Sequence, residues 1–213
     1  MDTVILANGP LSDFNTILVD MLEQAKIIIA VDGGGNHCLD LGVVPDILIG
    51  DFDSIKKEPF EFFEKKGVSI HRFSTKKDAT DLELALDIAQ VKGGKQICLA
   101  GVLGGRWDMS LANILLAAQE KYRSLQITLW SSDCIIMLNY PEQTNQIRGH
   151  KGKTVSFLPL QGDVCGISLT GFTYPLEDHT IAFGSTLGVS NIIESDVAIE
   201  YHDSGILLCI ILT

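Results

Sequence analysis

The first 130 or so residues alternate short apolar runs, rich in β-branched residues, with longer amphipathic segments. The runs that we interpret as strands are 3–7, 26–32, 46–50, 68–73, 96–102 and 126–130. Two of the intervening segments, 79–93 and 108–122, carry apolar side chains at helical spacing. In the second segment, the side expected to face the core carries Leu111, Ile114, Leu115 and Ala118. Strand–helix alternation predicts a mostly parallel sheet with helices on both faces.

The pattern changes between residues 131 and 140. Beyond this point apolar runs recur about every eight to twelve residues, separated by turn residues, as in a β-sandwich or barrel. These runs are 134–138, 154–160, 166–172, 180–184, 190–194, 197–201 and 205–212. We therefore predict an α/β domain over residues 1–133, followed by an all-β, sandwich-like domain over residues 134–213.

Composition excludes some classes of partner. The formal net charge of −11 argues against a protein that binds duplex nucleic acid, which needs a basic surface. The five cysteines are widely spaced without a CxxC pair, so neither a zinc site nor a disulfide framework is indicated. We find no signal peptide, and no apolar stretch approaches the roughly 18 residues of a membrane span. A cytoplasmic protein without a membrane partner is expected.

Four polar or glycine-rich clusters each follow a predicted strand. They are "VDGGGN" (31–36), "GDFDS" (50–54), "TKKDATD" (75–81) and "GVLGGRWD" (101–108). In an open parallel sheet, ligands bind beyond the carboxyl ends of the strands, so these clusters should meet along one edge. Neither the "GHKGKT" segment nor "GVLGGR" has the spacing of a P-loop or a dinucleotide fingerprint.

Each cluster also has a local structural interpretation. Residues 33–35 could form a tight turn, and Arg106 could be a surface charge. Thr80 and Glu83 have the spacing of a capping box, in which Asp81 would favour the helix N-terminus. Asp108 could be an N-cap. Asp51 and Asp53 could each bind backbone amides of their own loop.

Taken together, the clusters point to a ligand. Carboxylates gathered in one crevice repel each other and lose solvation, so they need a cation. The carboxylates concerned are Asp32, Asp51, Asp53, Asp78 and Asp81. Magnesium prefers such oxygen ligands together with substrate phosphates, and glycine amides and a forked guanidinium suit the phosphates. The constellation predicts a magnesium–nucleotide site.

The same motifs, with two later ones, resemble a known family. "VDGGGN", "GDFDSI", "KDATDLELAL", "GVLGGRWDMSLAN", "LTGFTYPL" and "STLGVSN" look like the motif series of thiamine pyrophosphokinases, from about residue 4 to 210. The resemblance implies transfer of a pyrophosphoryl group from ATP to the hydroxyl of thiamine, giving thiamine diphosphate and AMP. It also implies that the α/β domain binds nucleotide and magnesium. The β-rich domain would bind thiamine and form a homodimer with active sites at the subunit interface.

The resemblance also assigns residues. The magnesium ligands would be Asp51, Asp53 and Asp81, which with Asp78 form the catalytic set. The nucleotide-binding residues would be Asp32, Gly33, Gly34, Lys77, Gly104, Gly105, Arg106, Asp108 and Asn113. Thiamine would contact Tyr174, Ser190 and Asn191. Either Asp81 or Asp78 would accept the proton of the thiamine hydroxyl.

This sequence departs from the family pattern at two positions. Met109 stands where bacterial members usually have histidine, and Tyr174 where members often have tryptophan. Two alternative functions are a related kinase acting on another heteroaromatic alcohol or a pterin, and a nucleotide-sensing module without catalysis. The second is disfavoured, because a sensor need not keep Asp51, Asp53 and Asp81 together.

Overall fold

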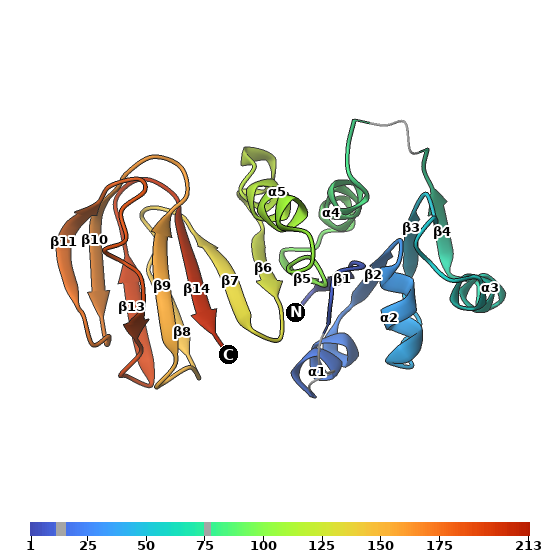
Figure 1. The fold of residues 1–213 in the computed structure, drawn as a ribbon, viewed down its shortest axis with the longest axis horizontal. Coiled ribbons are helices and arrows are strands. Elements are labelled where there is room, and N and C mark those ends of the chain that lie inside the picture. The colour runs from blue at the N-terminus through green and yellow to red at the C-terminus, as the bar shows by residue number, and fades with distance from the viewer. Residues whose placement is uncertain (12–15, 75–77) are drawn as a thin grey trace. The chain divides into compact units, whose positions relative to one another are not determined.

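The computed structural model describes residues 1–11, 16–74 and 78–213 (Figure 1). The chain forms two compact units, Met1–Ser132 and Asp133–Thr213. The first alternates strands and helices, and the second is built from antiparallel strands, so the predicted fold class is confirmed. No helix in the described ranges is long and apolar enough to cross a membrane.

The first unit contains a parallel sheet whose strands are all at or near the predicted positions. They are β1 (Thr3–Leu6), β2 (Ile27–Val31), β3 (Ile47–Gly50), β4 (Ser69–Arg72), β5 (Gln96–Ala100) and β6 (Gln126–Trp130). Their order within this unit is β6-β5-β1-β2-β3-β4, and every pair along it is parallel. Strands β1 and β3 are buried along their whole length, as expected for a sheet that is covered on both faces.

Helices connect successive strands. They are α1 (Thr16–Gln24), α2 (Gly34–Asp40), α3 (Lys57–Lys65), α4 (Asp81–Val91) and α5 (Trp107–Ala117), followed by the 3₁₀ turn η1 (Glu120–Tyr122). The chain runs from β1 outward to β4 and then returns to β5 on the other side of β1. Because such crossovers are right-handed, this reversal moves α4 and α5 to the face opposite α1 and α2, as Figure 1 shows.

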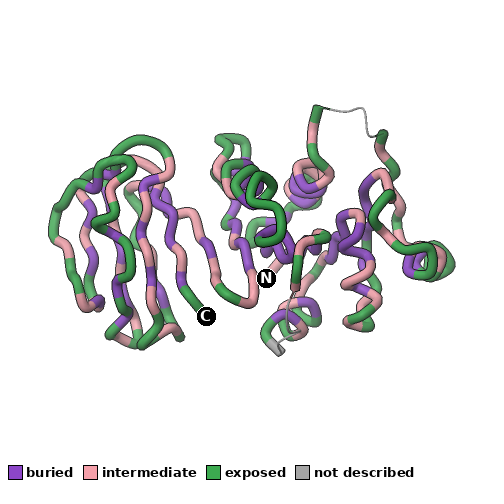
Figure 2. The backbone as a smooth tube through the Cα atoms, in the orientation of Figure 1, coloured by how far each residue is buried: buried purple, intermediate pink, exposed green. Residues whose placement is uncertain are grey.

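The predicted core-facing side of α5 is wrong. Leu111 and Leu115 are 56% and 49% exposed. The helix residues that are buried are Ser110, Asn113, Leu116 and Ala117. Figure 2 shows that much of the helix surface is exposed. Apolar residues lie on nearly every side of this segment, so periodicity did not single out one face. Polar contacts determine which face of α5 is buried, because Asn113 donates a hydrogen bond from Nδ2 to the Val102 carbonyl at 2.8 Å.

The second unit is a two-sheet sandwich. Its strands are β7 (Cys134–Asn139), β8 (Asn145–Arg148), β9 (Thr154–Pro159), β10 (Val164–Thr170), β11 (Leu176–Ile181), β12 (Asn191–Ile192), β13 (Val197–Tyr201) and β14 (Leu207–Leu212). Within this unit β12-β9-β14-β7 form one layer and β11-β10-β13-β8 the other. Strand β8 was not predicted, because only Ile147 in it is apolar. Only residues 180 and 181 of the run expected at 180–184 lie in a strand, as the end of β11, whose middle is exposed and polar.

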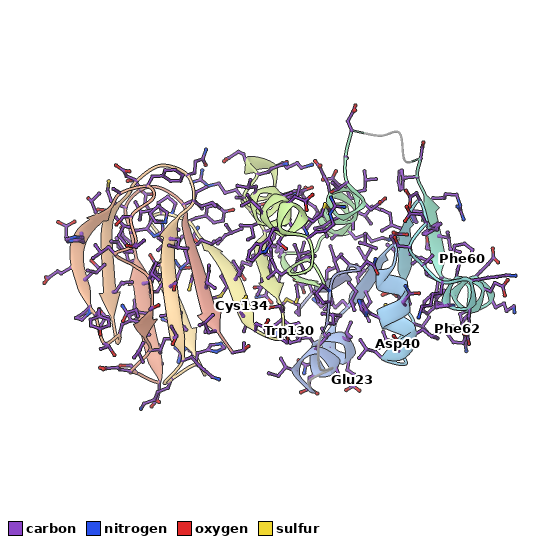
Figure 3. The ribbon with its side chains drawn as sticks, in the orientation of Figure 1. Glu23, Asp40, Phe60, Phe62, Trp130 and Cys134 are labelled. Atoms are coloured by element: carbon purple, nitrogen blue, oxygen red, sulfur yellow. The ribbon has the colours of Figure 1, made fainter. Side chains whose placement is uncertain are left out.

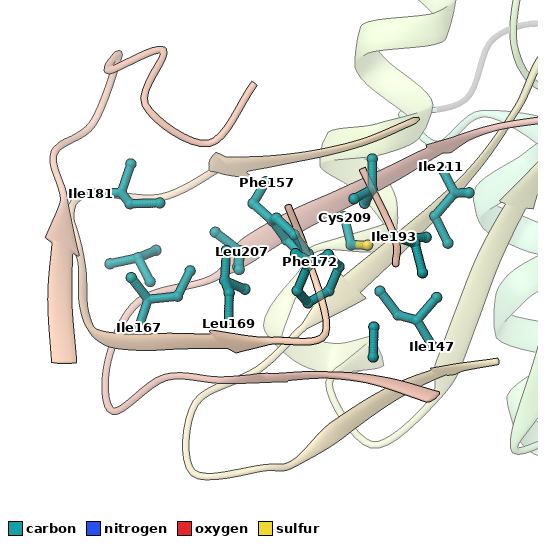
Figure 4. Close-up of a cluster of buried hydrophobic side chains, with 13 residues drawn as sticks. Ile147, Phe157, Ile167, Leu169, Phe172, Ile181, Ile193, Leu207, Cys209 and Ile211 are labelled. Carbon is teal, nitrogen blue, oxygen red and sulfur yellow. The ribbon is translucent and has the colours of Figure 1, made fainter. Parts of the chain in front are cut away.

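The two layers enclose an apolar cluster (Figure 4). Phe157 of β9 meets Phe172 edge to face, with ring centroids 5.4 Å apart and an interplanar angle of 87°. Ile167 and Leu169 of β10 and Leu207 of β14 are also buried in it. Alternate residues of both layers point inward, which is the packing of an aligned β-sandwich.

Two leucines on α5 test the orientation of this helix. Leu116→Ala removes a side chain that is 7% exposed and should lower the free energy of unfolding by about 2–4 kcal/mol. Leu111→Ala removes the same group from an exposed position and should change it by less than about 1 kcal/mol. Urea unfolding followed by circular dichroism measures both. A larger loss for Leu111→Ala than for Leu116→Ala would contradict the observed orientation.

Candidate active site

The first unit has a cavity of about 620 Å³ at the carboxyl ends of its strands. Loops after β1, β2, β3 and β5, together with the start of α4 and part of α5, form its wall. The lining residues are Ala7, Asn8, Gly9, Pro10, Val31, Asp32, Asp51, Ser54, Ala79, Thr80, Asp81, Leu82, Gly101, Val102, Gly104, Gly105, Arg106, Met109 and Asn113. The loops after β1 and β5 diverge here because the strand order reverses, and open sheets bind ligands at such a point.

Three carboxylates form a cluster at this edge. One oxygen each from Asp32, Asp51 and Asp53 lie within 4.8 Å of one another. Asp32 follows β2 and has a φ of 48°, while Phe52, between the other two, has a φ of 65°. Left-handed backbone is unusual for a phenylalanine, and here it places Asp51 and Asp53 on the same side of the loop.

The surroundings of Asp32 suit a bound cation. Its Oδ1 is buried without a hydrogen-bond partner. Burial raises the pKa of this carboxyl. Hydrogen bonds from Ser54 lower the pKa in part, and the charges of Asp53 and Asp51 raise it. A buried, unpartnered carboxylate oxygen beside two other carboxylates is unfavourable without a positive ligand. Hard oxygen donors in this arrangement fit a divalent cation such as magnesium.

Asp81, the other predicted magnesium ligand, lies at the cavity wall. It is the first residue of α4, outside the group of three clustered carboxylates. Thr80 caps this helix, because its Oγ1 accepts a hydrogen bond from the Glu83 amide at 3.2 Å. The capping interpretation of Thr80 is therefore confirmed, although the Glu83 carboxylate binds Lys121 at 2.7 Å. Asp78 is exposed and is not among the lining residues, and Lys77 is outside the described residues.

Two glycines at the start of α2 are required by space. A Cβ on Gly34 would lie 2.1 Å from the Leu6 carbonyl oxygen, and one on Gly33 would lie 2.1 Å from Oδ1 of Asn8. Gly33 has an ordinary φ of −60°, so the left-handed turn falls on Asp32 instead. The absence of these side chains lets α2 begin directly against the end of β1, next to the cavity.

The loop before α5 presents Arg106 to the cavity. Gly104 and Gly105 have φ angles of 84° and 68°, and the Gly104 amide donates to Oγ of Ser110 at 3.0 Å. Arg106 donates to both carboxylate oxygens of Asp108, at 3.2 and 2.5 Å, which holds the pKa of Asp108 below its usual value. Asp108 lies inside the first turn of α5, so the N-cap interpretation is wrong. Because the Arg106–Asp108 ion pair is exposed, it is weak, and a phosphate can replace Asp108 as the partner of Arg106.

The predicted thiamine-binding residues lie in the second unit. The Tyr174 side chain is largely exposed. The buried side-chain amide of Asn191 binds both backbone groups of Tyr174: it accepts from the amide at 3.0 Å and donates to the carbonyl at 2.8 Å. Ser190 has a φ of 60°, and its amide donates to Oγ of Ser156 at 3.1 Å. In this geometry Asn191 orients Tyr174 through its main chain.

Sequence reasoning missed one wall of the cavity and its supports. Residues 7–10, "ANGP", follow β1 and line the cavity. Nε2 of His37 donates to the Gly9 carbonyl at 3.0 Å and fixes this loop. Asn36 fixes the aspartate loop, because its side chain binds the Ser54 carbonyl at 3.2 Å and the Lys56 amide at 2.9 Å. The Asn-Gly pair directly after a strand was the available signal for the first loop.

Comparisons with known proteins agree with this arrangement. Residues 18–129 match the family model described as "Thiamin pyrophosphokinase, catalytic domain", and residues 140–207 match "Thiamin pyrophosphokinase, vitamin B1 binding domain". The chain is 35% identical to the thiamine pyrophosphokinase of Bacillus subtilis over 88% of this chain and 87% of that protein. The chain belongs to the thiamine pyrophosphokinase family.

Solved structures extend the likeness to the whole fold. The crystal structure of the Bacillus subtilis thiamine pyrophosphokinase matches with a TM-score of 0.90 and 32% identity, covering 100% of this chain and 99% of that one. The Candida albicans structure, at 18% identity and a TM-score of 0.82, shares the fold. The catalytic-domain match spans most of the cavity wall, and the other match spans Tyr174 and Asn191.

The carboxylate cluster predicts a stability effect. Asp32→Asn removes a half-buried charge that repels Asp51 and Asp53, and asparagine tolerates a φ of 48° well. At neutral pH in EDTA, the variant should therefore unfold about 2–6 °C higher than the wild type. As pH falls below the raised pKa of Asp32, the wild type takes up a proton there and the difference should shrink.

The exposed Asp20→Asn on α1 is the control for this measurement, because it removes one negative charge away from the cluster. Magnesium should raise the melting temperature of wild type and Asp20→Asn but not that of Asp32→Asn. If the two asparagine variants behaved alike in EDTA and in magnesium, Asp32 would not belong to a cation site.

Proposed function

We propose that this protein transfers the pyrophosphoryl group of ATP to the hydroxyl of thiamine, giving thiamine diphosphate and AMP. The main support is that two observations occur together. The family models match both units, and a carboxylate cluster lies in a cavity where the strand order of the sheet reverses. The hydroxyl oxygen bonds to the β-phosphorus, and the bond from that phosphorus to the oxygen bridging the α-phosphate breaks. That oxygen leaves with AMP.

Magnesium is the cation that we propose for the cluster. Asp32, Asp51 and Asp53 would hold it, because their oxygens already converge and one oxygen of Asp32 has no other partner. The resemblance of the sequence adds Asp81 to this set, and its place at the cavity wall is compatible with that role. The chemistry supplied by the cation is neutralisation of the charge that develops on the transferred group.

The residues of the chain supply the positioning. Arg106 lines the cavity, and its guanidinium can exchange Asp108 for a phosphate oxygen of ATP. Gly104 and Gly105 allow the backbone to approach the nucleotide closely. Asp81 is our candidate for the group that accepts the hydroxyl proton, because it lines the cavity whereas Asp78 is exposed outside it.

The nucleotide product is the direct test of this function. Incubation with ATP, magnesium and thiamine should form AMP and thiamine diphosphate in equal amounts, measured by ion-pair chromatography. Omission of thiamine is the control and should leave ATP intact. ADP with thiamine monophosphate would mean transfer of a single phosphoryl group, and AMP without thiamine consumption would point to another acceptor. Either result would overturn the proposal.

Tyr174 is the residue that we propose for the thiazolium cation of thiamine. An exposed aromatic face attracts such a cation by about 0.5–2 kcal/mol. Tyr174→Ala should therefore raise the Michaelis constant for thiamine about 3- to 30-fold and leave that for ATP nearly unchanged. Tyr140→Ala is not a suitable control because Tyr140 is buried. The matched control is Phe183→Ala, because Phe183 is an exposed aromatic residue in the same unit. This variant should leave both Michaelis constants close to the wild-type values.

We also propose that the enzyme is a homodimer in which two subunits share each active site. Exposed apolar side chains support this, with Trp107 in the first unit and Leu187 in the second. Mixing Tyr174→Ala chains with Asp51→Asn chains should then restore part of the activity at low thiamine, because some sites receive neither change. Mixtures no more active than the sum of their parts would contradict a shared site.

A further inference from the structure

Arg72 is an exposed residue at the end of β4 that none of the proposed roles uses. Strand β4 pairs with β3 so that Arg72 lies opposite Gly50, the residue immediately before Asp51. Nη1 of Arg72 donates a hydrogen bond to the main-chain oxygen of Asp51 at 3.2 Å. The guanidinium therefore contacts the aspartate loop through its backbone.

Arg72 also stacks on the residue between the two aspartates. Its guanidinium carbon lies 4.7 Å from the centroid of the Phe52 ring and 5.7 Å from that of Phe60. The two rings contact each other, with centroids 5.1 Å apart. Phe60 belongs to α3, which Figure 3 shows beside the end of the sheet where β4 lies. One arginine thus joins β4, α3 and the loop that carries Asp51 and Asp53.

The Phe52 backbone needs such support. Its φ of 65° lies in the left-handed region, which is strained for a bulky side chain and persists only where the surroundings enforce it. This conformation brings Asp51 and Asp53 together, and the Asp53 amide donates to Oδ1 of Asp51 at 3.2 Å. Relaxation of Phe52 to an ordinary φ would turn one of the two carboxylates away from the cluster.

We propose that Arg72 is a positioning residue for the cation site: by stacking on Phe52 and binding the Asp51 carbonyl, it holds Asp51 and Asp53 in the geometry that binds magnesium. This inference rests on the proposed function and adds a residue outside the cavity wall to it. Asn36 holds the other end of the same loop at Ser54 and Lys56. The carboxylates are thus fixed from both sides by groups that leave them available to the cation.

The direction in which metal affinity changes when Arg72 is replaced distinguishes a positioning role from a purely electrostatic one. Arg72 is a cation close to a cation site, so its charge alone would repel magnesium, and its removal would tighten metal binding. Loss of positioning would weaken metal binding instead. Arg72→Gln removes both the charge and the stack, whereas Arg72→Lys keeps the charge and loses the planar stack and fork. The positioning role predicts weaker binding in both variants.

The experiment measures Mn²⁺ binding to the full chain by water proton relaxation, with no turnover required. Arg72→Gln and Arg72→Lys should each raise the dissociation constant about 3- to 30-fold. Their melting temperatures in EDTA should change by less than about 4 °C. Arg123→Gln is the matched control, since Arg123 follows η1 before β6, at the opposite end of the strands, and should bind Mn²⁺ like the wild type.

A second test changes Phe52, the residue on which Arg72 stacks. Phe52→Leu removes the ring but leaves the Asp51 carbonyl, so adding Arg72→Gln to it should weaken Mn²⁺ binding by a smaller factor than Arg72→Gln does in the wild type. Unchanged or tighter binding in the Arg72 variants, or a lower melting temperature with normal binding, would overturn the inference. If the wild type bound Mn²⁺ and the variants did not, but no thiamine diphosphate formed, then the positioning role would stand and the proposed function would fail.

Discussion

Mutual repulsion among three carboxylates is the constraint around which the first unit is organised. Asp32, Asp51 and Asp53 bring oxygens within 4.8 Å of one another, and one oxygen of Asp32 is buried without a partner. Folding this arrangement without a cation is unfavourable, so the surrounding structure must supply the stability. It does so with a sheet whose strands β1 and β3 are wholly buried, and with backbone held at two left-handed positions.

The topology explains why these residues meet. Right-handed crossovers and a reversal of strand order at β1 place the loops after β1, β2, β3 and β5 around one cavity. Close packing at Gly33 and Gly34 then brings α2 against the end of β1. His37 supports the loop after β1, Asn36 the loop after β3 and Asn113 the loop after β5, while Thr80 caps α4.

The sequence predicted which residues gather at this edge of the sheet better than it predicted the contacts that support them. Parallel strands put their carboxyl ends at one edge, so carboxylates and glycines that follow successive strands in the sequence are expected at one site. The inward side of α5 could not be predicted, since it depends on polar contacts of Ser110 and Asn113 with a loop. Strand β8 was missed because only Ile147 in it is apolar, and the contact of Asn191 with Tyr174 was missed because it joins residues 17 positions apart in the sequence.

The position of a bound metal tests this account most directly. Crystals grown with Mn²⁺ and a non-hydrolysable ATP analogue would show the ion by anomalous scattering. We expect a peak within about 2–2.5 Å of carboxylate oxygens from Asp32, Asp51 and Asp53, and the same map would show whether Asp81 also contacts the ion. A fully occupied peak elsewhere, with these three carboxylates unliganded, would contradict the claim that a cation compensates their repulsion.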